Sequence, residues 1–100
     1  MPTYVMLTKL SADGLETLHD KPRRLFAVNQ EIKSLGCKLI AQYALLGQWD
    51  FLNIIEAPDN ETMAHLSIDL GARGTAQHLT MPALTPDELL PQLTGNIHLA

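Results

Sequence analysis

The order in which strand-type and helix-type patterns follow one another along the chain is the feature that most constrains its fold. A run rich in β-forming residues at positions 3–9 ends at a helix-start signal, Ser11 to Gly14. Two stretches with helical spacing of apolar residues follow, one around Leu15 and Leu18 and one over residues 25–35. Pro22 separates them, because proline fits a first helical turn but not a helix interior.

The second half of the chain repeats this pattern. Gly36 ends the helical stretch, and residues 38–46 and 51–56 are two β-type runs joined by a short turn that begins with Gly47, which predicts a hairpin. Asp59 or Asn60 can cap a second helix. The expected buried stripe of that helix is Met63, Leu66 and Leu70. Residues 75–81 predict a fourth strand that stops before Pro82.

The pattern weakens toward the carboxyl end. Thr85 and Glu88 form a capping box with Pro86 at the first helical position, and Pro91 limits the expected helix to about a turn and a half. The tail at residues 95–100 is expected to be loosely held. With 100 residues the chain is expected to form one domain, residues 1–100.

Two strand-helix units joined by a hairpin predict an α+β, ferredoxin-like βαββαβ domain, with a four-stranded antiparallel sheet and helices on one face. Alternation along the strands separates two sets of side chains. The set expected beneath the helices is Val5, Leu7, Leu39, Ala41, Tyr43, Leu52 and Ile54. The set expected on the bare face is Tyr4, Met6, Thr8, Ile40, Gln42, Ala44, Phe51, Asn53, Ile55, His78 and Thr80. One bulge would invert this assignment.

Composition favours self-association and excludes several classes of partner. Apolar residues make up 46% of the chain and charged residues 18%, below the roughly 25% of an average soluble domain. Part of the surface is therefore expected to be an apolar interface, and a homo-oligomer is predicted. The net charge of −4 argues against nucleic acid. The single cysteine, Cys37, and the lack of an export signal or a long apolar run predict a cytoplasmic protein with no membrane partner.

A set of short motifs resembles the GYD family of small bacterial and archaeal proteins. Residues 47–51 read Gly-Gln-Trp-Asp-Phe after an extended run at 41–46, and residues 56–60 and 71–75 continue the likeness. The resemblance runs from Tyr4 to about Leu90. It implies a ferredoxin-like subunit of the dimeric α/β-barrel type and a family of largely undefined biochemical role. It carries over no catalytic residues, and Trp49 stands where the motif usually has tyrosine.

Two groups of residues are candidates for a site. Trp49 and Asp50 lie in the predicted hairpin, where they serve either the turn itself or a ligand. If the bare face lines a pocket, several polar residues converge there; the alternative is that they form hydrogen bonds across a dimer seam or to water. These candidate pocket residues are Tyr4, Gln42, Asn53 and His78.

No metal site and no cofactor are expected within one subunit, although a metal site built between subunits is left open. The histidines, at positions 19, 65, 78 and 98, include no pair at ligand spacing. Three functions remain open. The first is a homo-oligomeric small-ligand-binding or accessory protein. The second is a cofactor-independent enzyme, an isomerase or monooxygenase, with His78 as acid or base. The third is a protein-interaction or regulatory module.

Overall fold

Strands and helices follow one another in the expected order in the computed structural model, which describes residues 1–94. The elements are β1 (Thr3–Leu10), α1 (Ala12–Asp20), α2 (Arg24–Ser34), β2 (Lys38–Ala44), β3 (Phe51–Glu56), α3 (Asn60–Gly71), β4 (Ala76–Ala83) and α4 (Pro86–Leu93). The expected loosely held tail at 95–100 lies outside the described residues.

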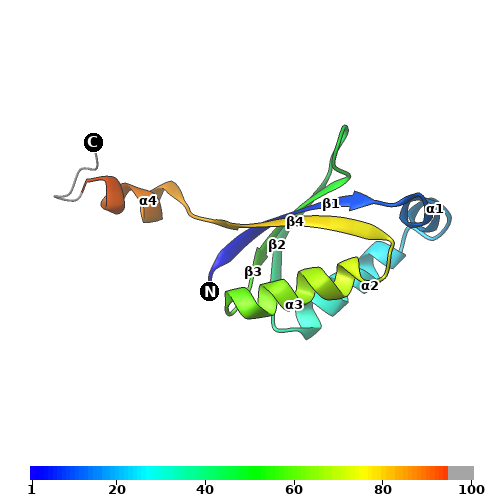
Figure 1. Ribbon diagram of the computed structural model, residues 1–100, viewed down its shortest axis with the longest axis horizontal. Coiled ribbons are helices and arrows are strands. Elements are labelled where there is room, and N and C mark those ends of the chain that lie inside the picture. Colours follow the sequence, from blue (N-terminus) through cyan, green and yellow to red (C-terminus); the bar gives the residue numbers. More distant parts are fainter. Residues whose placement is uncertain (95–100) are drawn as a thin grey trace.

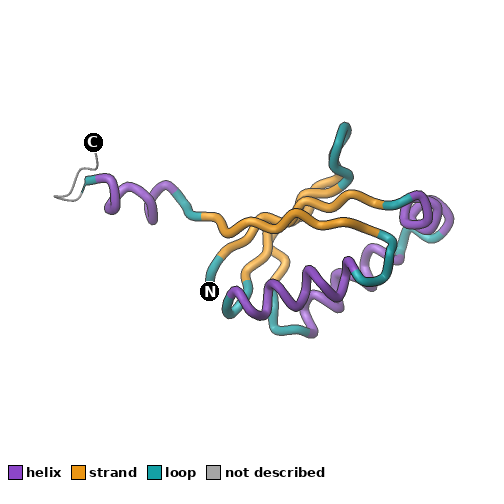
Figure 2. The backbone as a smooth tube through the Cα atoms, in the orientation of Figure 1, coloured by secondary structure: helices purple, strands orange, loops and turns teal. Residues whose placement is uncertain are grey.

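The four strands form one antiparallel sheet in the order β2-β3-β1-β4. Helices α2 and α3 lie side by side against one face of this sheet, and α1 lies beyond its end (Figure 1). The opposite face carries no helix of the described chain (Figure 2). This is the ferredoxin-like α+β arrangement, so the predicted fold class is confirmed.

The helix ends form where the local sequence predicts them. The Ser11 side chain accepts a hydrogen bond from the Gly14 amide at 3.1 Å and so caps α1. Asp59 caps α3 by accepting from the Thr62 amide at 2.8 Å. Gly36, which follows the end of α2, has a φ of 80°, a conformation that glycine adopts without strain. The short connection at residues 21–23 separates α1 from α2, as Pro22 predicts.

The core shows that the predicted face assignment is wrong. Tyr4, Met6 and Ile55 are buried beneath the helices, where they pack with the predicted α3 stripe of Met63, Leu66 and Leu70. Most of the side chains expected there, including Val5 and Leu7, lie on the helix-free face instead. Both alternating sets of β1 are mainly apolar, so alternation alone cannot choose between them.

Strand β2 contains a register shift, so Leu39 and Ala41, which were expected on the same face of the sheet, lie on opposite faces. Leu39 is opposite Ile55 and Ala41 is opposite Ile54, so Ile40 has no partner of its own and forms a bulge. Ile40 is 47% exposed. Leu39 therefore packs against the core, whereas Ala41 and Tyr43 stand on the helix-free face.

Two proline predictions are also wrong in detail. Strand β4 continues through Pro82 to Ala83, because β4 is an edge strand, where the missing N–H of a proline is tolerated. Helix α4 continues past Pro91 to Leu93, with the predicted capping box between Thr85 and Glu88 present. This helix projects from the body as an arm whose residues are all exposed (Figures 1 and 2).

Candidate functional site

A cavity of about 110 Å³ lies between the sheet and helix α2. Apolar side chains of α2, Leu25, Val28 and Ile32, form one wall. The sheet forms the opposite wall, with polar side chains from all four strands. These polar side chains are Gln42, Asn53, Thr8 and His78. Apart from Asn29 of α2 and Arg73 after α3, the helix side of the cavity is therefore apolar, and the sheet side is able to form hydrogen bonds.

The polar side chains are joined in one continuous row across the sheet. Gln42 Nε2 donates to Asn53 Oδ1 at 2.8 Å, and Asn53 Nδ2 donates to Thr8 Oγ1 at 3.2 Å. Thr8 Oγ1 lies 3.1 Å from His78 Nδ1. At the other end of the row, the amide groups of Gln42 and Asn29 exchange two hydrogen bonds of 3.1 Å. A residue of helix α2 is thus hydrogen-bonded to the β2 end of the row that the strands form.

Strand register explains why these residues meet. Asn53 stands opposite both Gln42 on β2 and Met6 on β1, and Thr8 stands opposite His78 on β4. Cross-strand neighbours on one face lie close enough for their side chains to interact. Antiparallel pairing in this register therefore brings residues from distant parts of the sequence into a single hydrogen-bonded row.

A backbone carbonyl fixes the direction of the donors in this row. Asn53 Nδ2 donates to the Met6 carbonyl oxygen at 2.9 Å, and a carbonyl can only accept. The Asn53 amide nitrogen must therefore face Met6 and Thr8, and its oxygen must face Gln42. Thr8 Oγ1 accepts from Asn53, and among the described residues His78 Nδ1 is the acceptor that lies within reach of the Thr8 hydroxyl proton. From this network we assign the remaining imidazole proton to Nε2.

His78 ends the row with an unused donor. Its Nε2 is buried and has no hydrogen-bond partner within the described chain. Burial lowers the pKa of His78 below its ordinary value of 6.5, so the imidazole is neutral at pH 7. In this tautomer Nε2 carries a proton and can act only as a hydrogen-bond donor. To act as a base there, the ring would have to move its proton to Nδ1, the atom that already accepts from Thr8.

Tyr4 shares a sheet face with the row but does not line the cavity. Its side chain is 3% exposed, and its hydroxyl donates to Asn60 Oδ1 at the start of α3. Burial raises the pKa of Tyr4, and the nearby carboxylates of Asp59 and Glu61 raise it further. Of the predicted pocket residues, the structure thus brings together Gln42, Asn53 and His78 and leaves Tyr4 apart.

The hairpin candidates lie away from this cavity. Asp50 Oδ2 accepts from the Leu10 amide at 2.7 Å, and the Asp50 amide donates to the Thr8 carbonyl at 2.8 Å. Asp50 therefore joins the hairpin to the end of β1, a structural role in which its carboxylate serves another strand. Trp49 is half-buried beside it.

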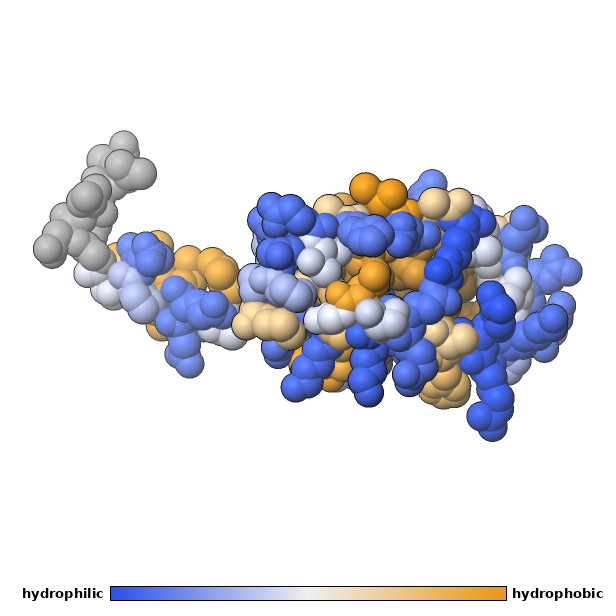
Figure 3. All heavy atoms as spheres, turned by 90° about the horizontal axis from the view of Figure 1, so that it is seen from below, coloured by the Kyte–Doolittle hydropathy of each residue, from blue (hydrophilic) through white to orange (hydrophobic). Residues whose placement is uncertain are grey.

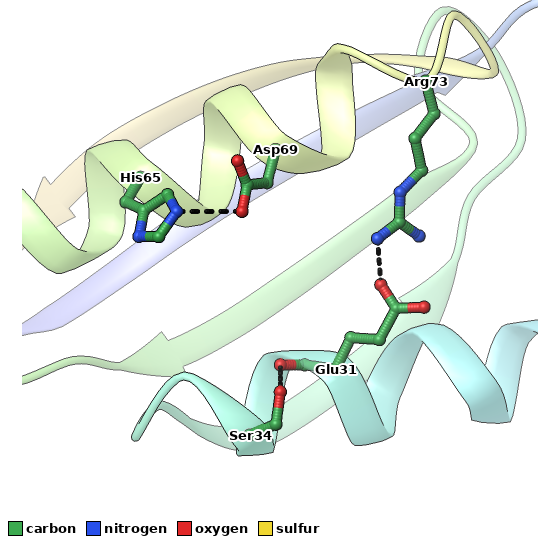
Figure 4. A network of polar contacts seen from close by, with 5 residues as sticks. All are labelled: Glu31, Ser34, His65, Asp69 and Arg73. Carbon is green, nitrogen blue, oxygen red and sulfur yellow. Dashed lines mark hydrogen bonds and ion pairs between the residues drawn. The ribbon is translucent and has the colours of Figure 1, made fainter.

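Sequence reasoning missed Asn29, Thr8 and Arg73 as cavity residues. The position of Asn29 could have been predicted from helical spacing, because it follows Val28 and lies three residues before Ile32 on the buried side of α2. Arg73 follows the end of α3, and its guanidinium pairs with Glu31 of α2 (Figure 4). The pair joins the two helices that cover the sheet. It raises the pKa of Arg73 further above its ordinary value.

A second cavity, of about 190 Å³, adjoins the first. The two share wall residues, among them Leu10, Leu25, Val28 and Arg73. The second extends toward α1, where Gly14, Thr17 and Leu18 line it. The space beneath the helices thus continues from His78 toward the end of the sheet at α1.

Other kinds of site are not evident in the part of the chain that the structure describes. There, no cluster of His, Cys, Asp and Glu side chains has the composition and spacing of a metal site. Among residues 1–94, none of the helices combines the length and the hydropathy needed to span a bilayer.

Comparison with known proteins identifies a family, a relative and a solved structure of similar fold. The model of the GYD domain family matches residues 4–91. A Thermus thermophilus protein named "Glutamine synthetase and cystathionine beta-lyase binding protein" is 40% identical over 94 residues, covering 93% of this chain and 99% of the relative. The crystal structure of another Thermus thermophilus protein, TTHA0845, matches with a TM-score of 0.55 at 18% identity, over 85% of this chain and 95% of that one. At this identity the structural likeness concerns the fold alone.

Proposed function

We infer that this chain, which belongs to the GYD domain family, is an accessory protein that binds other proteins and does so as a homo-oligomer. The observation that carries the proposal is the helix-free face of the sheet. Its central side chains are all apolar and stand opposite one another in register. They are Ala41 and Tyr43 on β2, Leu52 and Ile54 on β3, Val5 and Leu7 on β1, and Leu79 and Met81 on β4. We call this set the open face.

The open face is exposed enough to favour association. Tyr43 is 60% exposed, Leu79 43% and Met81 38%. Full burial of one large apolar side chain is worth about 1.5–3 kcal/mol. Association costs on the order of 4–15 kcal/mol in lost freedom of motion, so several such side chains must be covered together. The open face offers them as one contiguous group.

A second copy of this chain is the occupant we propose for the open face. The centre of the face carries no charged side chain, so two identical faces meet without like-charge repulsion, and two-fold pairing would cover both. The arm supports the same idea, because Leu89, Leu90 and Leu93 of α4 are 43%, 53% and 62% exposed. Seen from the helix side, the arm extends away from the body and displays apolar side chains (Figure 3).

Partner proteins would then bind the surfaces that pairing leaves free. The helix side of the molecule is a mixture of hydrophilic side chains and smaller apolar patches (Figure 3). Phe26 on α2 and Ile68 on α3 are 60% and 68% exposed there. The 40% identical relative is named for binding glutamine synthetase and cystathionine β-lyase, so we propose these two enzymes as the first partners to test.

Light scattering during size exclusion tests self-association with a matched pair of variants. We expect the wild type to be at least a dimer at micromolar concentration. Ile54→Lys places a charge in the centre of the open face and should yield a monomer, whereas Ile68→Lys on α3 should not change the assembly. Leu79→Lys is the second choice if Ile54→Lys does not fold. A monomeric wild type, or an Ile54→Lys variant that still assembles, contradicts the proposal.

Binding to partners is tested separately, with purified glutamine synthetase and cystathionine β-lyase from the organism that encodes this chain. Each enzyme is immobilised, and wild-type protein is passed over it in a biosensor. We expect saturable binding to at least one enzyme and weaker binding by Ile68→Lys, which alters the helix side. Absence of binding to both enzymes would refute this choice of partners, whatever the assembly state.

A further inference from the structure

We propose that the cavity beneath α2 binds a small, neutral and largely apolar molecule whose carbonyl-type oxygen accepts a hydrogen bond from Nε2 of His78. This goes beyond the proposed protein-binding role, because it concerns the interior of one subunit. Nε2 is the buried side-chain polar atom without a hydrogen-bond partner within the described chain. Such an atom is costly to bury without a partner, and because His78 lines the cavity, the cavity is the side from which a missing acceptor would approach it.

The hydrogen-bonded row gives this donor a fixed identity. The Met6 carbonyl orients the Asn53 amide, the Asn53 amide occupies one lone pair of Thr8 Oγ1, and the Thr8 hydroxyl donates to Nδ1. This arrangement gives the Thr8 hydroxyl proton an acceptor, whereas a proton on Nδ1 would leave the Thr8 proton without a partner among the described residues. The ring therefore presents N–H at Nε2, and a ligand that offers only another donor would leave it unfilled.

The size of the space limits the ligand. A cavity of about 110 Å³ is smaller than the roughly 150 Å³ apolar cavity that holds benzene, but it continues into the adjoining space of about 190 Å³. A molecule with one small ring or a short branched chain fits this volume. Its apolar body would lie against Leu25 and Val28, which line both parts.

The charges around the cavity favour a neutral ligand. Of its described wall residues, Arg73 alone is charged at neutral pH, and its guanidinium is engaged by Glu31. A buried carboxylate would face a neutral imidazole and an already paired guanidinium, so it would lack a counter-charge. A ketone, ester or amide oxygen accepts the same hydrogen bond without that cost.

The test compares two probes of nearly the same shape. Cyclohexanone carries a carbonyl oxygen, and methylenecyclohexane carries a CH₂ group in its place. Both are titrated into ¹⁵N-labelled wild-type protein, and amide and imidazole nitrogen signals are followed. We expect cyclohexanone to shift the signals of Thr8, Asn53 and His78 and to bind about fivefold more tightly than the hydrocarbon, the usual effect of one hydrogen bond. Cyclohexanecarboxylate should bind more weakly than cyclohexanone.

Variants assign the preference to His78. His78→Leu removes the donor and should make the two probes bind equally, whereas His65→Leu, an exposed histidine on α3, should keep the preference. If His78→Leu does not fold, Thr8→Val serves instead, because loss of the hydroxyl releases the imidazole proton from Nε2 and should reduce the preference. Equal binding of the two probes to the wild type, or no shift at the cavity residues, overturns the proposal without any variant.

Discussion

Replacing Asn53 by Asp would test the claim that the polar row depends on donors held against fixed acceptors. Asn53 is 3% exposed, and its amide nitrogen donates to the Met6 carbonyl at 2.9 Å and to Thr8 Oγ1 at 3.2 Å. An ionised carboxyl has the same shape but no donor. It would place a negative charge against the Met6 carbonyl oxygen in a buried position. We therefore expect Asn53→Asp to destabilise the protein strongly at neutral pH.

The size of the effect follows from protonation. The introduced carboxyl can regain one donor by taking up a proton. From an unfolded-state pKa of about 3.9, this costs about 1.4 kcal/mol per pH unit, or about 4 kcal/mol at pH 7. The second lost donor adds about 1 kcal/mol. Because burial raises the folded-state pKa of this carboxyl above its unfolded value, the penalty is smallest below about pH 4 and grows as pH rises toward the folded-state pKa.

Urea unfolding followed by circular dichroism from pH 4 to pH 7.5 measures this penalty against the wild type at each pH. Asn60→Asp is the matched control, because Asn60 is exposed in the first turn of α3. There the introduced carboxyl keeps an oxygen for the Tyr4 hydroxyl and lies where a helix amino terminus favours negative charge. A penalty for Asn53→Asp that does not change between pH 5 and pH 7, or that equals the control, would refute the reasoning.

Two further predictions concern contacts that hold the ends of the sheet. Gly14→Ala should lower the free energy of unfolding by about 1–3 kcal/mol, because a Cβ there would lie 2.1 Å from the Thr75 carbonyl oxygen. Gly71→Ala is the control, because the nearest atom to its added Cβ would be 4.0 Å away. In the same urea assay it should be neutral or stabilising by up to about 1 kcal/mol. A Gly14→Ala variant that is as stable as this control would contradict the first expectation. Asp50→Ala should lower the free energy of unfolding by about 1–2 kcal/mol. It removes the acceptor of the Leu10 amide, so hydrogen exchange at that amide should become faster. Unchanged exchange there would argue against the anchoring role of Asp50.

Local signals were sufficient to predict the order of the elements and most helix ends. The caps at Ser11 and Asp59 and the glycine after α2 act within four residues of the helix end they define. Such interactions are contained in the sequence itself. The error at Pro82 has a non-local cause, because the tolerance of a proline in a strand depends on whether that strand lies at the edge of the sheet. Helix α4 runs two residues past Pro91, to Leu93.

The choice of sheet face could not be predicted for a different reason. Polar residues such as Asn53 and Thr8 were expected to face away from the helices because burying an unpaired polar group is costly. They are nevertheless buried, since neighbours on adjacent strands satisfy them, and those neighbours are fixed by a register that no short stretch of sequence reveals. The prediction that Gln42, Asn53 and His78 lie together is nevertheless correct, because residues on the same face of a sheet remain neighbours whichever face the helices cover. Asn29 was missed because it reaches the row from a helix.

The inverted assignment separates the two proposals in space. The polar side chains that were expected on the helix-free face line the cavity, and the open face consists of apolar residues such as Leu52 and Ile54. Successive residues on one strand point to opposite sides, so Asn53 contacts the cavity while its neighbours face outward. A second copy and a cavity ligand would therefore contact opposite sides of the same strands. Ile54→Lys should consequently abolish assembly and leave the preference for cyclohexanone intact.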